Sequence, residues 1–102
     1  MTLGSQTYSK TGLLAILKNP TSSDASIILA RQLIAAKLNV ANGSDPTPVS
    51  STINDADSLL GCFAGKLPYK VKTNSATGKA MVNDATVLNN YNNNQLTPGC
   101  AP

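Results

Sequence analysis

The sequence predicts an all-α fold, a compact bundle of four helices around a central helix at about residues 24–41, with one short extended segment at about residues 66–72. Three observations predict this architecture. The run at 24–41 is the longest and most apolar stretch of the chain. Three other segments repeat apolar residues at helical spacing between residues that start and stop helices. Only 4% of the residues are aromatic, so small aliphatic side chains, which suit closely packed helices, have to build the core.

The central helix has a marked start, a marked end and a wide apolar surface. Ser22, Ser23 and Asp24 are N-cap candidates, and Asn42-Gly43 predicts a left-handed C-terminal cap. At about 100° per residue, the apolar residues form two adjacent stripes that cover more than half of the circumference. The first stripe is Ile27, Ala30, Ile34, Leu38 and Ala41, and the second is Leu29, Leu33, Ala36 and Val40. A surface helix has a narrower stripe, so we expect neighbours on two sides.

Polar residues on the central helix bear on two further points. Arg31, Gln32 and Lys37 interrupt the apolar run, which is therefore too short and too polar to predict a membrane span. Arg31, Gln32 and Asn39 fall on the remaining narrow face. If this face reaches solvent, it is a surface for partners. If another segment covers it, the three side chains have to be hydrogen-bonded inside the protein.

The helices on either side of the central one have their own start and stop residues. Ser9 is the expected N-cap of a helix over 10–18. Thr47 is the expected N-cap of another, with Pro48 at its first position and Gly61 as its C-cap. Their apolar faces are Leu13, Leu14, Ile16 and Leu17 in the first helix, and Val49, Ile53, Ala56 and Leu60 in the second.

The last helix and the extended segment complete the chain. A fourth helix is expected from Ser75 or Thr77 to about Asn93, with Met81, Ala85, Leu88 and Tyr91 on its inner face. Before it, apolar residues alternate with lysine or proline, a period of two that is typical of extended chain. This segment is expected to place Leu67, Tyr69 and Val71 on the core. Residues 1–8, anchored by Leu3 and Tyr8, are its only candidate strand partner.

Length and charge limit the classes of partner. At 102 residues the chain is expected to be a single helical domain, residues 1–102. Charged residues make up 13% of it, with a net charge of +3, against about 25% charged in typical domains. The basic residues are scattered except for Lys66, Lys70 and Lys72, which are expected to face partners. Nucleic-acid binding requires a denser basic patch, so no such partner is expected.

Two cysteines predict the compartment. A Cys62–Cys100 disulfide would close a loop of about 39 residues and contribute about 4 kcal/mol on the chain-entropy model, and it implies an oxidising environment. The alternative is two buried free thiols. Met1–Ser5 lacks the basic and apolar parts of a signal peptide. We therefore expect the chain to be a fragment of a larger secreted or cell-surface protein.

The catalytic groups of common enzymes are missing. The chain has no His and no Glu, which excludes imidazole acid–base chemistry and leaves no set of metal ligands or cofactor motif. Among the aspartates, Asp55 and Asp57 point away from each other on one helix. The chain is therefore expected not to be an enzyme. A further hypothesis is that the amide-rich stretch around Asn89, Tyr91 and Asn92 contacts a glycan.

Gln32–Asn39 with Gly43, and Leu88–Asn93, match two patterns of a known module, Gln-Leu-Ile-Ala-Ala-Lys-Leu-Asn followed by Gly, and Leu-x-x-Tyr-Asn-Asn. The chain thus resembles a helical module of secreted and cell-surface multidomain proteins of environmental bacteria. There, the module follows a Gly-Phe/Tyr-Trp-Lys-Asn-His segment, which this sequence lacks. The resemblance covers most of the chain and implies an extracellular, modular context. It transfers no catalytic residue.

These observations predict a non-catalytic extracellular module that serves structure or protein–protein contact. Its partners would be other domains of the parent protein, other surface proteins or a second copy of itself. The alternative is a ligand-binding module for carbohydrate or a small apolar molecule, which would need a cavity between the helices.

Overall fold

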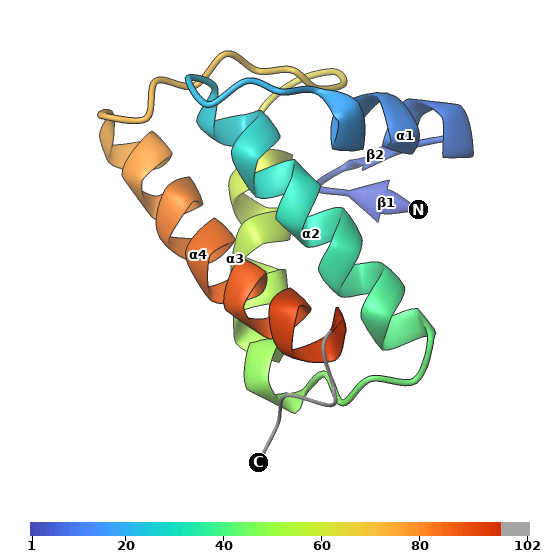
Figure 1. Ribbon diagram of the computed structural model, residues 1–102. Coiled ribbons are helices and arrows are strands. Elements are labelled where there is room, and N and C mark those ends of the chain that lie inside the picture. Colours follow the sequence, from blue (N-terminus) through green and yellow to red (C-terminus); the bar gives the residue numbers. More distant parts are fainter. Residues whose placement is uncertain (97–102) are drawn as a thin grey trace.

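A computed structural model describes residues 1–96, with side chains described through residue 93. It confirms the mostly helical bundle (Figure 1). The elements, in chain order, are β1 (Thr2–Leu3), β2 (Gln6–Thr7), α1 (Lys10–Lys18), α2 (Ala25–Ala41), the short 3-10 turn η1 (Thr47–Val49), α3 (Ser50–Gly61) and α4 (Ala76–Leu96). Within the described residues, no helix is both long enough and apolar enough to cross a membrane.

Helix α2 lies at the centre and contacts α1, α3 and α4. It runs parallel to α4, because Asp24 pairs with Lys72 just before both helices begin, and Asn39 meets Asn92 near their ends. Helix α3 runs in the opposite direction, behind α2 and α4 in Figure 1, and packs against both. The predicted position of the central helix is therefore confirmed.

The core follows the predicted apolar faces. Its largest fully buried side chains are Leu3, Ile27, Leu29, Leu33, Ile34, Leu60, Met81 and Leu88. In the first predicted stripe of α2, the side chains are buried as far as Ile34, but Leu38 is 44% exposed. On α1, only Ile16 is buried, while Leu14 and Leu17 face solvent. The apolar face of α1 is therefore only half covered by the described residues.

The first eight residues form a feature that the helical pattern did not predict. Strands β1 and β2 make an antiparallel hairpin around Gly4-Ser5, where Gly4 has φ of 62°. Glycine at the first central position suits a type II′ turn, which matches the twist of the strands. Leu3 and Tyr8 are buried as expected. The hairpin pairs with itself and not with the extended segment.

Both ends of α3 differ in the structure from the ends that the sequence predicts. Thr47 does not cap α3, because one 3-10 turn comes first and the Thr47 N–H donates to Asp45 Oδ1 (3.0 Å). Gly61 is the last residue of α3, and Cys62 is the C-cap. The close packing of the hairpin on α3 depends on Gly4, where a Cβ would lie 2.8 Å from the Gly61 backbone nitrogen.

The segment at 66–72 is non-helical as predicted, but it forms no strand, and Lys70, with φ of 55°, departs from extended backbone. Val71 is buried, Leu67 and Tyr69 are half-buried, and Lys70 and Lys72 are exposed. Its one described ladder contact is an isolated antiparallel bridge between Lys72 and Asp24. Side chains of α2 and the hairpin, described next, hold the rest of it in place.

Candidate interaction surface

The stretch Cys62–Ser75, here called the 62–75 loop, crosses the end of the bundle at which α2 begins (Figure 1). Asp24, the N-cap of α2, fastens it there. Asp24 Oδ1 accepts hydrogen bonds from the Ser26 N–H (3.0 Å), the Ser26 hydroxyl (2.6 Å) and the Val71 N–H (3.1 Å). Asp24 Oδ2 accepts from the Lys70 N–H (3.1 Å). One carboxylate therefore caps the central helix and satisfies two backbone donors of the loop.

Further contacts fix the loop on both sides of Lys70. The Leu67 N–H donates to the Tyr8 hydroxyl (2.9 Å), and the Tyr69 N–H donates to Ser26 Oγ (3.1 Å). Lys70 has φ of 55°, in the left-handed region, which costs a residue other than glycine about 1–2 kcal/mol. The two hydrogen bonds from residues 70 and 71 to Asp24 offset this cost. The loop is thus held in one conformation by the bundle beneath it.

The outer surface of the loop combines aromatic and basic side chains. The rings of Phe63 and Tyr69 stack with centroids 4.8 Å apart and an interplanar angle of 12°. Burial, and secondly the neighbouring Tyr8 hydroxyl, raise the pKa of Tyr69 to about 12, so its phenol remains a neutral donor to Gly65 O (2.7 Å). The Lys66 ammonium lies over the Tyr8 ring, 5.5 Å from its centroid. Lys66, Lys70 and Lys72 are all exposed, as expected.

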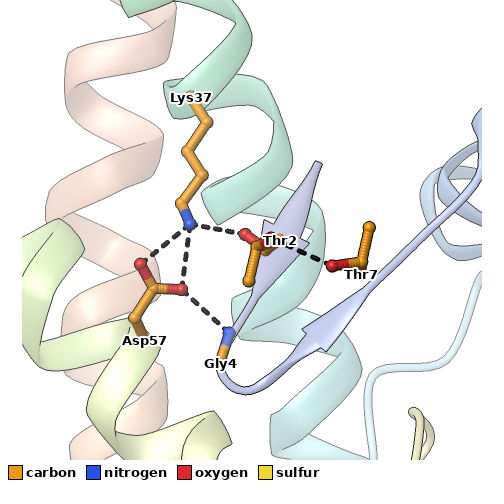
Figure 2. Close-up of polar contacts among 5 residues, drawn as sticks. All are labelled: Thr2, Gly4, Thr7, Lys37 and Asp57. Atoms are coloured by element: carbon orange, nitrogen blue, oxygen red, sulfur yellow. Dashed lines mark hydrogen bonds and ion pairs between the residues drawn. The ribbon is translucent and has the colours of Figure 1, made fainter.

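A second polar cluster joins the hairpin to α2 and α3. Figure 2 shows Lys37 Nζ between the Asp57 carboxylate (2.8 and 2.9 Å) and the Thr2 carbonyl (2.6 Å). Asp57 Oδ1 also accepts from the Gly4 N–H (2.9 Å). Asp57, which faces away from the core on the helical pattern, therefore has a structural role: it holds the hairpin on the helices. The three ammonium donors of Lys37 are used within the chain.

The polar face of α2 is tied inside the protein. Arg31 Nη1 donates to the Asn19 carbonyl (2.6 Å). The Asn92 amide donates to both the backbone and the side-chain oxygen of Gln32 (3.0 Å each) and accepts from Asn39 (3.1 Å). Arg31, Gln32 and Asn39 are half-buried, so the geometry fits the covered, hydrogen-bonded alternative and not an open surface for partners.

The three residues considered for glycan contact do not lie together on the surface. Asn92 is 2% exposed and Tyr91 is 6% exposed. Tyr91 donates its hydroxyl to the Asp45 carbonyl (2.8 Å), which ties α4 to the chain before η1. Asn89 alone is exposed. The described structure therefore leaves no aromatic face here for a sugar ring.

Two open cavities lie between the helices. One, of about 350 Å³, lies between α2 and α3 and is lined by Lys37, Val40, Pro46, Ser50, Ile53 and Asn54. The other, of about 250 Å³, lies between α2 and α4 and is lined by Ile28, Gln32, Val82, Ala85, Thr86 and Asn89. Neither includes a residue of the 62–75 loop. The first reaches the lower end of the volume range of small-molecule sites.

Asp55 of α3 and Asp84 of α4 form a pair that sequence reasoning missed. The Asp55 carboxyl lies near enough to raise the pKa of Asp84. Two carboxyl groups can share a hydrogen bond only when one holds a proton, because an ionised carboxylate only accepts. Asp84 Oδ2 is buried and has no hydrogen-bond partner among the described residues. Burial, followed by the hydrogen bond to Asp55 and its charge, raises the pKa of Asp84 to about 7.

This pair predicts that stability falls as the pH rises from about 4 to about 7. Between the ordinary pKa of 3.8 and the folded value near 7, the folded chain holds a proton that the unfolded chain has released, so raising the pH favours unfolding. Because solvent still reaches part of this carboxyl pair, it screens the interaction, and the expected loss of unfolding free energy is about 1–2 kcal/mol. Urea unfolding across this range, followed by circular dichroism, measures it.

Two variants test this assignment. Asp84→Asn should remove the decline, and Asp55→Asn should reduce it only in part, since burial is the larger cause. With no His and no Glu in the chain, no other side chain has its ordinary pKa inside this window. An unchanged slope in Asp84→Asn contradicts the assignment.

Cys62 is exposed at the end of α3, and its thiol donates to the Ser58 carbonyl (3.3 Å). Cys100 lies outside the described residues, so the Cys62–Cys100 disulfide stays a prediction. In the part of the chain that the structure describes, no three His, Cys, Asp or Glu residues lie close enough to hold a metal ion together.

No family model, no curated protein and no solved structure matches the chain. Its resemblance to the helical module of bacterial surface proteins is therefore untested by these comparisons. The candidate surface rests on the geometry of the 62–75 loop alone.

Proposed function

We propose that the chain is a non-catalytic interaction module of a secreted or cell-surface protein, and that the 62–75 loop is its interaction surface. The absence of His and Glu from the sequence supports a role without catalysis. The low charge of the surface and the two cysteines support an extracellular setting. The partners are other domains of the parent protein or other surface proteins.

The observation that carries the proposal is the way in which the loop is built. The bundle supplies a helix cap, a buried phenol and a serine hydroxyl to hold backbone N–H groups of the loop. It also holds Lys70 in a left-handed conformation. Costly backbone conformations that the surrounding structure enforces are concentrated at functional sites. Here that cost serves to present an exposed basic side chain in a fixed place.

A titration monitored by NMR tests the assignment of the surface. The ¹⁵N-labelled chain is titrated with an acidic peptide, a neutral peptide, an acidic and a neutral polysaccharide, and vesicles of anionic lipid. We expect saturable shift changes at the amides of residues 62–75 with at least one of these probes. Saturable changes confined to other residues, or none with any probe, would overturn the proposal.

A second candidate, a small-molecule carrier, is favoured by the 350 Å³ cavity between α2 and α3. Its lining is half apolar, with Val40, Pro46 and Ile53 beside the polar side chains of Lys37, Ser50 and Asn54. A small ligand there would shift the methyl resonances of Val40 and Ile53 and leave those of the 62–75 loop unchanged. The same spectra therefore separate the two functions.

The extracellular setting has its own test. Maleimide labelling of the native chain, with and without prior reduction, counts the free thiols. We expect no labelling of Cys62 or Cys100 before reduction. Labelling of both thiols in the unreduced chain would remove the support that the cysteines give to an oxidising compartment.

A further inference from the structure

We propose that the 62–75 loop binds an acidic segment of a partner protein, with Lys66, Lys70 and Lys72 as the groups that recognise its carboxylates. The inference rests on the proposed interaction surface and names the chemistry of its partner. Three properties of the described residues lead to it: the distribution of charge, the state of the backbone groups in the loop, and the way in which its aromatic rings are used.

The excess positive charge of the chain lies in this loop. The net charge of +3 comes from eight basic and five acidic residues. Outside the loop there are five basic residues, Lys10, Lys18, Arg31, Lys37 and Lys79, which equal the five aspartates in number. The loop itself has three lysines and no acidic residue. A surface of one sign attracts a partner of the opposite sign and directs its approach.

The charges of the loop are not neutralised within the described structure. The one ion pair among residues 1–93 joins Lys37 to Asp57, away from the loop. Asp24, the acidic residue that touches the loop, uses both carboxylate oxygens on backbone and hydroxyl donors. The ammonium groups of Lys70 and Lys72 therefore remain available. Lys66 is positioned by the Tyr8 ring and is also exposed.

The backbone of the loop favours a peptide over other polyanions. The N–H groups of Leu67, Tyr69, Lys70 and Val71 are all bonded to the bundle. The carbonyls of residues 66–70 have no hydrogen-bond donor among the described residues. The loop thus offers carbonyl acceptors without a described partner beside its three exposed lysines. An acidic peptide supplies what matches both, main-chain N–H groups and carboxylates.

The aromatic rings favour recognition by charge over stacking. Phe63 and Tyr69 each use one face on the other ring, and the Lys66 ammonium covers a face of Tyr8. A sugar polymer or single-stranded nucleic acid would use open aromatic faces as platforms. Here one face of each ring is used within the chain, and the lysines are the charged groups of the loop left to contact a partner.

Fluorescence anisotropy at low ionic strength tests the inference. The probe is a labelled peptide of alternating Asp and Ser, and its neutral counterpart alternates Asn and Ser. The loop variant is Lys66→Gln, Lys70→Asn and Lys72→Gln, in which asparagine tolerates the left-handed conformation of residue 70. The matched control is Lys10→Gln, Lys18→Gln and Lys79→Gln, which removes the same charge from α1 and α4.

We expect the native chain to bind the acidic peptide and not the neutral one. The loop variant should weaken binding by at least about tenfold, while the control should weaken it by less than about threefold. Circular dichroism establishes that both variants are folded. Equal losses in the two variants would show a diffuse charge effect and overturn the inference.

Competing polyanions separate this inference from the proposed function. If polygalacturonate or oligo-dT binds more tightly than the peptide and loses affinity in the loop variant, the partner class is wrong and the interaction surface stands. If the acidic peptide binds but shifts only amide resonances outside residues 62–75, both the partner class and the interaction surface are wrong. If the acidic peptide does not bind at low ionic strength but another probe still shifts the amide resonances of the loop, the inference is wrong and the interaction surface stands.

Discussion

Asp24→Ala is expected to lower the free energy of unfolding by about 3 kcal/mol, because the carboxylate has two structural roles. Loss of an N-cap costs about 1 kcal/mol, and a buried donor left without its partner costs a further 1–3 kcal/mol. The Val71 N–H is such a donor, since Val71 is a buried residue of the loop. Equilibrium unfolding in urea, followed by circular dichroism, measures the total.

Two variants separate the cap from the loop contacts. Asp24→Asn keeps one side-chain oxygen for capping, so it should cost less, about 1–2 kcal/mol. Asp45→Ala removes an exposed carboxylate that accepts one hydrogen bond, from the Thr47 N–H, and should cost under about 1 kcal/mol. Asp24→Ala should also speed hydrogen exchange at Lys70 and Val71. A cost no larger than that of Asp45→Ala would contradict the role assigned to Asp24.

The helices could be predicted from the sequence because the signals that define them are local. The N-caps Ser9 and Asp24 act within three residues of the helices that they start, and the apolar period identifies the buried face. The same patterns predicted the core residues Met81, Ala85 and Leu88, which are buried. The hairpin also has a local sequence pattern, because a Gly4-Ser5 pair between two short runs of alternating polar and apolar residues is typical of a hairpin turn.

The candidate surface could be predicted only in part, since its geometry depends on distant contacts. The alternation in residues 66–72 indicates which side chains face solvent. It does not reveal that Asp24, about 47 positions earlier, bonds the backbone of Val71. In the same way, Asp55 and Asp84 are far apart in the sequence and meet only because α3 packs against α4. A shared feature is that each precedes a buried alanine, Ala56 or Ala85.

Gly78→Ala is expected to destabilise the protein by about 3 kcal/mol, the upper part of the range for overpacking. Gly78 lies in the first turn of α4, directly against the end of the 62–75 loop. A Cβ at this position would overlap the Lys72 carbonyl oxygen and lie 2.8 Å from its carbon. That carbonyl accepts from both the N–H and the hydroxyl of Ser75 (3.1 and 2.7 Å), so the turn that begins α4 would have to move.

The same substitution in α1 provides the control. At Gly12 a Cβ would meet only ordinary contacts of 3.5 Å or more, so Gly12→Ala should stabilise the protein by about 0.5–1 kcal/mol through helix propensity. Thermal and urea unfolding of the two variants should therefore shift in opposite directions. NMR spectra of Gly78→Ala should show altered amides at Lys72–Ser75 while those of α1 stay unchanged. Equal stability of the two variants would mean that the loop does not cross α4 as closely as described.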